Sequence, residues 1–589
     1  MIHFKFNPKD SRYIFIVPDT KDDIKVCQAL VKTVNLVDPI CYLSSYKGPV
    51  FTNDYIWEYV QTSGKRIFYC SIGLWYVCYK FFKDNDIEFD GLDKEWFKQP
   101  IQHSFEEFKE IVSKWGLKFS PRPYQLDTAY KILTWRRSIS QLATRAGKTL
   151  IAYLVFRYAI EYLKAKKILM IVPSIDLVKQ GYADFNEYAE FFKTECVWGG
   201  GKLVESSNLT IGTFQSLIKM LDKSSKKYNP KFFEDFDIVF VDEVHRATAA
   251  QTKTIITQPF INSCKIIFGM TGTLPKPGTS ERFGVEALLG TKIQTITPKE
   301  LQDNGFISQI HINQIRLKYT DKERQLEEWL KAAEYVLSDY VIEKNLKGQN
   351  CKIKLSKQNF LYQYEKTLPV EIALNKKIIY KKTIDSGGTE LTAKLAYKKY
   401  LEKTLSVSTR GNKLLIEKMM IHQFGERIDY LVGQVLPKCD KNTLILAQHT
   451  SYIEHIYGII KDYYPDKIVC KITGAVNAKK REEIRLLMKE HNNVIILASY
   501  GTMSTGLTLS NLCYGVLFES FKSNVVNMQS IGRGLGLSDL KDKYILYDIN
   551  DVFDSKYASN KFYLQAVEKT KIYQNPENQY EYSVENVNI

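Results

Sequence analysis

The sequence has no long apolar run and no paired cysteines, and these absences narrow the class of protein. Apolar stretches such as Ile168–Val172 are short, whereas a helix that crosses a bilayer needs about 20 apolar residues. The 10 cysteines are scattered singly, without a CxxC pair, so neither a zinc site nor a disulfide framework is indicated. We expect an intracellular, cytoplasmic protein without a membrane partner.

Acidic residues are too few to balance the basic ones. The chain carries 82 Lys and Arg against 66 Asp and Glu, which gives a formal net charge of +16. Such a surplus favours a polyanionic partner, because each phosphate that a cation neutralises releases condensed counterions. A Lys-rich composition without such a partner is the alternative. We expect nucleic acid to be the partner.

The stretch QLATRAGKTL at 141–150 ends as a phosphate-binding loop does, in Gly-Lys-Thr. A helical pattern follows directly, and buried-strand patterns follow at 167–174 and 236–245. In such a loop the backbone N–H groups hold the phosphates, the lysine reaches the terminal ones and the threonine hydroxyl can ligate Mg²⁺. The predicted nucleotide-binding residues of the loop are Ala143, Thr144, Arg145, Ala146, Gly147, Lys148 and Thr149.

An acidic tetrad, Asp242-Glu243-Val244-His245, comes at the end of the second of these strand patterns. Its side chains are expected at the carboxyl end of the strand, where open α/β sheets bind ligands. Asp242 is placed to hold Mg²⁺ through water, with Thr149 as the other metal-ligating residue. Glu243 is placed to orient and deprotonate the attacking water. We predict Lys148, Asp242, Glu243 and His245 as catalytic residues of an ATP hydrolase.

Eight segments occur in the order of the motifs that mark superfamily 2 helicases, a family that the chain resembles. They are RPYQLDTA (122–129), IVPSIDLVKQ (171–180), IGTFQSL (211–217), GMTGTL (269–274), NTLILAQH (442–449), KITGAVNAKKREEI (471–484), VIILASYGTMSTGLTL (494–509) and NMQSIGRGLGL (527–537). Over roughly residues 115–575 the chain is most similar to the phage UvsW-type helicases, within a broader XPB- and RecG-like group.

The resemblance implies a role for further residues. It assigns Arg122, Gln125 and Gly506 to nucleotide binding, with Gln125 as the contact of the adenine ring. It assigns contacts with a nucleic-acid backbone to Pro173, Ser174, Gly212, Thr213, Gln215, Gly474, Ser499 and Thr505. Thr271, Gly272 and Thr273 are expected to couple hydrolysis to movement, and Gln529 and Arg533 to act in catalysis.

At 589 residues the chain is too long for a single hydrophobic core. Strand patterns alternate with helical ones in both the middle and the later part, which is typical of parallel sheets. We predict an α/β fold of two tandem RecA-like parallel-sheet motor domains with a small α+β N-terminal domain. The expected divisions are 1–110 (N-terminal), 111–300 (first motor domain), 301–553 (second motor domain, with a basic helical insertion at about 320–410) and 554–589 (C-terminal helix and tail).

Two positions depart from the family pattern. Arg145 stands where such loops carry a small residue, commonly glycine, and we expect nucleotide binding to survive because its side chain can point away. Gly536 stands where the second-domain motif ends in a second arginine after Arg533. An arginine aimed at developing phosphate charge can be worth roughly 10³–10⁵ in rate. The change therefore either slows hydrolysis or leaves the task to Arg533.

Two regions outside the motor motifs carry distinctive residues. The aromatic residues of 1–110, including Trp57, Trp75 and Trp96, are expected in a core rather than as base-stacking platforms. Lys344–Arg410 carries 15 basic residues against five acidic ones. A basic arm that contacts nucleic acid and a solvated insertion explain this surplus equally well.

The resemblance implies an ATP-dependent DNA helicase or translocase that remodels forks, junctions and strand-invasion loops in recombination, replication or repair, in a phage or virus and so in host cytoplasm. ATP and Mg²⁺ are the implied cofactors, and branched or duplex DNA the implied partner. Three alternatives stay open: the same motor on RNA or transcription complexes, a translocating subunit of a restriction system, and an ATP-gated clamp with weak hydrolysis.

Overall fold

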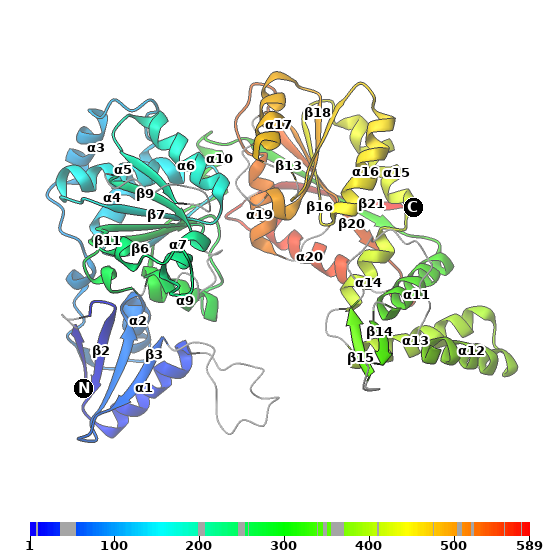
Figure 1. The fold of residues 1–589 in the computed structure, drawn as a ribbon, viewed down its shortest axis with the longest axis horizontal. Coiled ribbons are helices and arrows are strands. Elements are labelled where there is room, and N and C mark those ends of the chain that lie inside the picture. Colours follow the sequence, from blue (N-terminus) through cyan, green and yellow to red (C-terminus); the bar gives the residue numbers. More distant parts are fainter. Residues whose placement is uncertain are drawn as a thin grey trace. The chain divides into compact units, whose positions relative to one another are not determined.

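The computed structural model divides into two compact units, Met1–Thr297 and Pro298–Ile589 (Figure 1). The break lies close to residue 300, where the sequence predicts the boundary between the motor domains. The structure describes residues 1–6, 10–35, 55–197, 207–244, 254–256, 258–338, 340–344, 350–354, 370–408, 412–474, 476, 478–503, 509, 511–519, 523–558, 560–578 and 580–589. None of the helices it describes is long and apolar enough to cross a membrane.

The first unit begins with a five-stranded sheet in the order β3-β4-β2-β1-β5. Its elements are β1 (Ile2–Phe6), β2 (Tyr13–Pro18), α1 (Lys21–Val34), β3 (Ile56–Val60), β4 (Arg66–Ser71), η2 (Ile72–Leu74), α2 (Trp75–Asp84), β5 (Phe89–Asp90) and η3 (Lys94–Phe97). Thr20 and Asp23 begin α1 with a capping box, in which each side chain accepts the backbone N–H of the other. A core that includes Phe4, Phe68 and Phe82 lies between sheet and helices. We call residues 1–97 the N-terminal module.

The rest of the first unit is a seven-stranded parallel sheet in the order β12-β6-β11-β10-β7-β9-β8. Its strands are β6 (Arg137–Leu142), β7 (Ile168–Val172), β8 (Thr194–Val197), β9 (Leu209–Thr213), β10 (Ile238–Asp242), β11 (Ile266–Thr271) and β12 (Lys292–Ile296). Its helices include α3 (Phe105–Ser113), α4 (Pro123–Thr134), α5 (Lys148–Tyr162), α6 (Ile175–Tyr188), α7 (Phe214–Leu221) and α9 (Ser280–Leu289).

Helices cover both faces of this sheet (Figure 1). Successive residues of a strand point to opposite faces. Val239 and Val241 therefore share a core with α7 and α9, whereas the ring of Phe240 lies 6.1 Å from that of Phe156 on α5. Because both faces are covered, the central strands are continuous apolar runs rather than alternating ones.

The second unit is also built on a seven-stranded parallel sheet, in the order β17-β18-β16-β19-β20-β13-β21. Its strands are β13 (Gln309–Lys318), β16 (Thr443–Ala447), β17 (Ile468–Ile472), β18 (Val494–Ser499), β19 (Tyr514–Leu517), β20 (Lys543–Val552) and β21 (Glu581–Asn588). Its helices include α10 (Pro298–Asp303), α14 (Asn412–Ile421), α15 (Gly425–Tyr430), α16 (Thr450–Tyr463), α17 (Ala478–Glu490), α18 (Tyr500–Met503), α19 (Asn524–Arg533) and α20 (Lys561–Tyr573).

The C-terminal residues are part of this sheet rather than a tail beside it. β21 pairs in parallel with β13, with His311 opposite Glu581 and Lys318 opposite Asn588. α20 contacts β20 through the buried side chains described below. The predicted tail at 554–589 thus supplies the last strand of the second sheet.

The insertion in the second unit consists of helices and a two-stranded ribbon. They are α11 (Lys322–Ser338), β14 (Tyr340–Lys344), β15 (Asn350–Lys354), α12 (Val370–Asp385) and α13 (Glu390–Ser408). Lys376 forms an ion pair with Glu334 at 2.8 Å, and Lys394 one with Glu327 at 2.7 Å. Part of the basic surplus of the insertion is therefore neutralised by carboxylates of α11. The contact of this arm with nucleic acid stays a prediction.

Candidate active site

The phosphate loop joins β6 to α5 through two residues in the left-handed region. Arg145 has φ 69° and Gly147 has φ 76°. Glycine adopts this conformation without penalty, whereas other residues lose roughly 1–2 kcal/mol there. Arg145 thus adopts the left-handed conformation for which this position of the loop usually carries glycine. Its guanidinium is half-buried, and burial lowers the pKa of Arg145.

Helix α4 holds the loop through the carbonyl of Ala146. The Gln125 amide Nε2 donates to that carbonyl at 2.9 Å, and the Tyr124 hydroxyl donates to it at 2.8 Å. Gln125 Oε1 accepts the backbone N–H of Arg122 at 2.8 Å. A Cβ on Gly147 would lie 2.3 Å from Gln125 Nε2, so any other residue there would displace this amide from the loop. Sequence reasoning missed Tyr124, and the contact of Gln125 with an adenine ring stays a prediction.

Lys148 and Glu243 are in direct contact at the carboxyl edge of the first sheet. Lys148 Nζ lies 2.7 Å from Glu243 Oε1, and each side chain is 17% exposed. Lys148 follows the loop after β6, and Glu243 follows β10. A single strand, β11, lies between β6 and β10 in the sheet. Terminal phosphates that attract Lys148 compete with Glu243 for the lysine. Nucleotide binding would thereby release the carboxylate to a water molecule.

The end of β11 and the residue after it lie beside the Glu243 carboxylate and the start of the phosphate loop. The buried Thr271 hydroxyl lies 3.3 Å from Glu243 Oε2 and 2.9 Å from the carbonyl of Thr273. A Cβ on Gly272 would lie 3.6 Å from the carbonyl of Leu142, at the start of the phosphate loop. A movement of Glu243 would therefore change its contact with Thr271, one of the residues predicted to couple hydrolysis to movement.

Thr149 and Asp242 fit a Mg²⁺ ion shared with a nucleotide. Thr149 lies in the first turn of α5, and Asp242 is the last residue of β10. Both offer oxygen, and Mg²⁺ is usually held by one or two protein oxygens together with phosphates and water. Among the described residues there is no cluster of three or more His, Cys, Asp or Glu that could hold a metal ion.

A carboxylate that the sequence did not single out lies beside Thr149. Burial raises the pKa of Asp184, on α6, to about 6, against hydrogen bonds with Gln180 and Thr149 that lower it. A single aspartate in a helical pattern carries no signal that could have identified it. It ties the first turn of α5 to α6.

The two predicted nucleic-acid segments of the first unit leave the sheet side by side. β7 and β9 are parallel neighbours, with Val172 opposite Thr213. Ser174 accepts the backbone N–H of Leu177 at the start of α6, and Thr213 accepts that of Ser216 at the start of α7. Of the other predicted residues here, Gln215 is exposed, Pro173 is partly exposed and Gly212 is buried. This edge therefore presents two helix N-termini, which favour anions.

The second sheet brings its predicted residues to one edge in the same way. β17 and β18 are parallel neighbours, with Ile472 opposite Ala498, so the exposed Gly474 and the partly exposed Ser499 lie at the same edge of the sheet. Ser499 Oγ lies 2.6 Å from Thr502 Oγ1. His245, Thr505 and Gly506 lie outside the described residues.

The comparisons with known proteins agree with this geometry. A model of the family described as "Type III restriction enzyme, res subunit" matches residues 118–276. The chain is 26% identical over 474 residues to the "ATP-dependent DNA helicase uvsW" of Enterobacteria phage T4, over 78% of this chain and 76% of that protein. It is 26% identical over 234 residues to the "DNA 3'-5' translocase XPB2" of Sulfurisphaera tokodaii, over 40% of this chain and 48% of that one. These likenesses support the resemblance to superfamily 2 helicases that the sequence motifs indicate.

Among solved structures, the crystal structure of T4 UvsW aligns with 100% of this chain and 99% of its own, at 21% sequence identity and a TM-score of 0.40. The predicted α/β fold with two parallel sheets is confirmed by the structure itself, and the predicted resemblance to superfamily 2 helicases by the matching family model and the phage T4 relative. The assignments of individual site residues stay predictions, now with a defined geometry.

Helix α19 of this helicase carries Gln529 and Arg533, four residues apart and therefore on one face. The helix ends at Arg533, and a Cβ on Gly534 would lie 2.1 Å from the ring of Tyr544. The chain has left the helix by Gly536, whose carbonyl accepts the Ser308 hydroxyl at 2.9 Å. The glycine that replaces the second arginine thus lies outside the helical frame of the motif.

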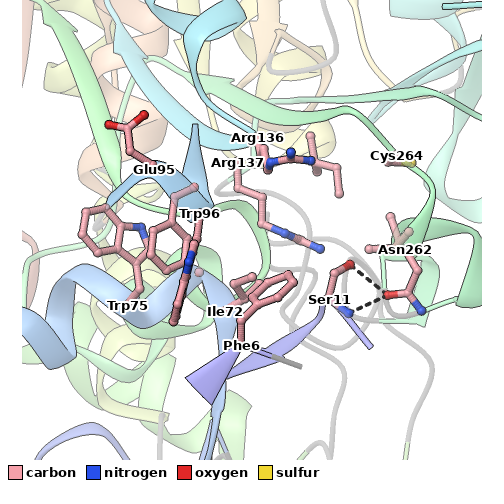
Figure 2. Close-up of a pocket in the computed structure, with 14 residues that line it drawn as sticks. Phe6, Ser11, Ile72, Trp75, Glu95, Trp96, Arg136, Arg137, Asn262 and Cys264 are labelled. Carbon is pink, nitrogen blue, oxygen red and sulfur yellow. Dashed lines mark hydrogen bonds between the residues drawn. The ribbon is translucent and has the colours of Figure 1, made fainter. Parts of the chain in front are cut away.

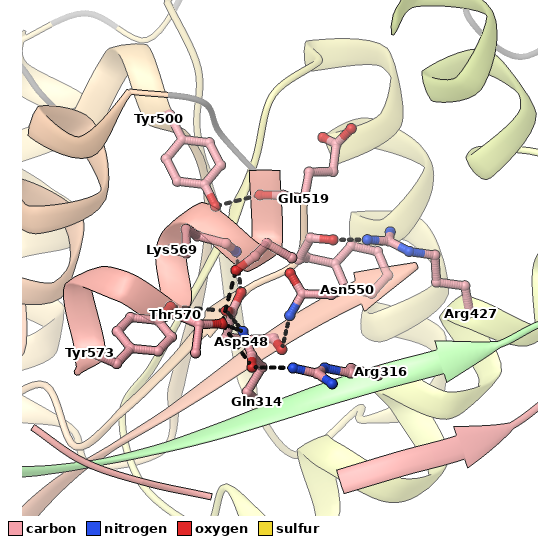
Figure 3. A network of polar contacts seen from close by, with 12 residues as sticks. Gln314, Arg316, Arg427, Tyr500, Glu519, Asp548, Asn550, Lys569, Thr570 and Tyr573 are labelled. Carbon is pink, nitrogen blue, oxygen red and sulfur yellow. Dashed lines mark hydrogen bonds and ion pairs between the residues drawn. The ribbon is translucent and has the colours of Figure 1, made fainter. Parts of the chain in front are cut away.

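A buried polar network fixes α20 to the second sheet (Figure 3). Asp548, on β20, forms an ion pair with Lys569, and both side chains are almost fully buried. The Tyr573 hydroxyl donates to Asp548 Oδ2 at 2.9 Å, and Gln314 Nε2 donates to Thr570 Oγ1 at 3.0 Å. Removing one partner would leave a buried charge uncompensated, at a cost of about 3–5 kcal/mol.

A second part of the network reaches the segment at 442–449. Arg427 Nε donates to Asp551 at 2.8 Å, and its Nη2 donates to the carbonyl of Phe518. The next residue, Glu519, accepts the backbone N–H of Gln448. Buried groups thus set the position of the chain where β16 and β19 end.

Proposed function

We propose that the chain is an ATP-dependent DNA helicase or translocase that remodels branched DNA in recombination, replication or repair. The observation that carries the proposal is the contact chain Lys148–Glu243–Thr271. It joins the group for the terminal phosphates, the group for the attacking water and the segment predicted to couple hydrolysis to movement. The printed names of the phage T4 and Sulfurisphaera relatives support DNA as the partner and ATP as the fuel.

Each residue of the site has a distinct task in this proposal. The phosphate loop and Lys148 bind the phosphates, and Thr149 with Asp242 would hold Mg²⁺, which neutralises developing phosphate charge. Glu243, once released by Lys148, orients and deprotonates water. Arg533 stabilises the transition state. The edges that carry Ser174, Gln215, Gly474 and Ser499 contact the DNA backbone, which gives affinity without sequence preference. Because it acts on DNA, the protein would work in the cytoplasm, which is that of the host cell if a virus encodes it.

The test is a titration of ATP turnover with a four-way DNA junction, a linear duplex, single-stranded DNA and RNA of equal length. The proposal predicts the strongest stimulation by the junction. It also predicts that ATP, and not a non-hydrolysable analogue, converts the junction into two duplexes. Strongest stimulation by RNA would contradict the DNA assignment and favour an RNA motor.

The family description of residues 118–276 favours one second candidate, the translocating subunit of a restriction system. Such a subunit moves along unbranched duplex DNA on behalf of a separate nuclease. It predicts ATP turnover that rises with the length of a linear duplex and is indifferent to a junction. The same titration, extended to duplexes of increasing length, separates the two functions.

A further inference from the structure

A pocket of about 460 Å³ lies between the N-terminal module and the first parallel sheet, within the first unit (Figure 2). The N-terminal module lines it with Phe6 and Trp96, and the sheet side lines it with Arg136, Arg137 and Asn262. The volume falls in the range of small-ligand sites, about 300–1,000 Å³. It is room for one small molecule or one nucleotide, and far too little for a double helix.

The pocket is distinct from the phosphate loop. Arg137 is the first residue of β6, and the loop begins after its last residue, Leu142. A strand rises about 3.3 Å per residue, so the two sites lie about 17 Å apart at opposite ends of β6. A ligand in this pocket would therefore leave the phosphate loop free.

Arg137 places a cation in the pocket that no described carboxylate neutralises by an ion pair. Its Nη1 donates to the carbonyl of Leu288, whereas the nearby Asp10 is held by Arg12, whose Nε donates to Oδ1 at 2.7 Å. Burial lowers the pKa of Arg137 to about 10. A guanidinium has five N–H donors, and an anion is the partner that best satisfies the rest.

The opposite wall is aromatic. Trp75 is stacked with Phe97 at 4.5 Å and with Trp135 at 5.9 Å, and its side chain is almost fully buried. Trp96 is partly exposed and makes only tilted contacts, with Phe6 at 5.8 Å and Phe97 at 6.5 Å. The sequence predicts Trp75 and Trp96 in the core. Both line the pocket, and Trp96 is the partly exposed one.

A polar group completes the pocket beside the guanidinium of Arg137 (Figure 2). Asn262 Oδ1 accepts both the backbone N–H and the hydroxyl of Ser11, at 3.1 and 3.0 Å. Its Nδ2 is left to donate to a ligand. The acid at the rim, Glu95, is paired with Lys98 at 2.7 Å and so does not repel an anion.

We propose that this pocket binds one nucleotide, with its unpaired base against Trp96 and its phosphate at Arg137. The same chemistry is offered by a free mononucleotide and by an unpaired nucleotide at the end or branch of a DNA strand. The strand source rests on the proposed function, and it would give the enzyme a means to sense an unpaired nucleotide.

The test uses the full chain with the Lys148→Ala substitution, so that the phosphate loop binds nucleotide only weakly and no competing nucleotide is added. Binding is measured by calorimetry for dTMP and inorganic phosphate, and by anisotropy for a duplex with an unpaired thymidine overhang and for its blunt counterpart. Arg137→Gln and Trp96→Ala should each weaken nucleotide binding about tenfold or more, from the loss of a charged hydrogen bond and of stacking. Trp96→Phe and Arg66→Gln, which removes an arginine that is paired with Glu58 and does not line the pocket, are matched controls that should bind as the Lys148→Ala chain does.

The outcomes separate the two sources and the proposal itself. Binding of dTMP at least about tenfold tighter than phosphate, lost in both variants, assigns a free nucleotide. A preference for the overhang over the blunt duplex that both variants lose assigns the strand. Equal binding of dTMP and phosphate without overhang preference, or unchanged binding by a folded Trp96→Ala protein, overturns the pocket. An unsubstituted chain without DNA-stimulated ATP turnover would contradict the proposed function, whereas the dTMP titration would still test the pocket.

Discussion

Each of the two parallel sheets carries a motif that departs from the family pattern. The backbone conformation of the motif is kept at one departure and changed at the other. In the first sheet Arg145 adopts φ 69°, so the loop keeps the turn that glycine usually makes. In the second, α19 has ended at Arg533 before the chain reaches Gly536. The first departure preserves the geometry of its motif, whereas the second replaces it. A departure from a motif is therefore judged by backbone conformation as well as by side chain.

The largest effect is expected at Arg533, which this comparison leaves as the sole arginine of its motif. Arg533→Ala should lower ATP turnover by about 10³-fold or more, because an arginine on developing phosphate charge is worth that much. ATP affinity should stay nearly intact, since the contact strengthens only in the transition state. Arg485→Ala, which removes a partly exposed arginine paired with Glu482, should change neither. Near-normal turnover of Arg533→Ala would place the arginine elsewhere.

A smaller, pH-dependent effect is expected at Asp184, beside the phosphate loop. Burial raises its pKa in the folded chain to about 6, above the value of about 3.9 of an unfolded aspartate. Protonated Asp184 therefore contributes to the free energy of unfolding. This contribution is complete below about pH 4 and is lost as the pH rises through 6.

Asp184→Asn, which mimics the protonated form, should therefore be more stable than the unsubstituted chain at pH 8, by about 2–3 kcal/mol. The gap should shrink on lowering the pH to 5, measured as the difference in thermal unfolding midpoint of the first unit. A gap that does not vary with pH would show that Asp184 titrates normally.

A still smaller effect is expected from Arg145→Gly. Glycine relieves the left-handed conformation but adds entropy to the unfolded chain, so the net gain in stability should be below about 1 kcal/mol. ATP affinity should change less than about threefold, because the backbone contacts of the loop persist. Thermal unfolding checks the first point and equilibrium titration with an ATP analogue checks the second, each alongside Arg145→Ala. A tenfold loss of affinity in both variants would mean that the Arg145 side chain contacts the nucleotide.

The smallest effect is expected from Gly536→Arg. The sequence alone predicts equal or faster hydrolysis, because the substitution restores the missing arginine of the motif. Gly536 lies beyond the end of α19, so an arginine there is not held in the helical position that the motif requires. Contacts with the transition state need exact placement, and we therefore expect turnover within about twofold of the unsubstituted chain. Steady-state ATPase rates decide it, and an increase of tenfold would show that the chain after Gly534 can bring residue 536 to the phosphates.

The motor fold and the nucleotide site could be predicted because local patterns specify them. Parallel strands covered on both faces are continuous apolar runs, and phosphate loops need glycine, lysine and threonine at fixed places. These two signals are enough to predict Lys148 and Glu243 at the carboxyl edge of one sheet. The contact of Tyr124 with the loop could not be found this way, because a tyrosine at the start of a helix usually serves packing.

Other features could not be predicted because their partners are far apart in the sequence. Asp548 and Lys569 are separated by 21 residues, and each resembles an exposed charge until the fold buries both. β21 alternates polar residues with few apolar ones, as an edge strand does, and so carries a weak strand signal. The carboxylates that neutralise the basic insertion lie in α11, outside the stretch that carries the basic surplus.

The most direct test of the Lys148–Glu243 pair is to measure ATP binding and ATP turnover of Glu243→Gln side by side. Loss of the general base should lower turnover by about 10²–10⁴-fold. ATP binding should be kept or strengthened, because Lys148 no longer has to break an ion pair with Glu243 before it contacts the phosphates. Lys148→Ala should weaken ATP binding as well as turnover, since it removes the charge that grips the phosphates. Normal turnover by Glu243→Gln would contradict the account, and the water-activating group would have to be sought elsewhere.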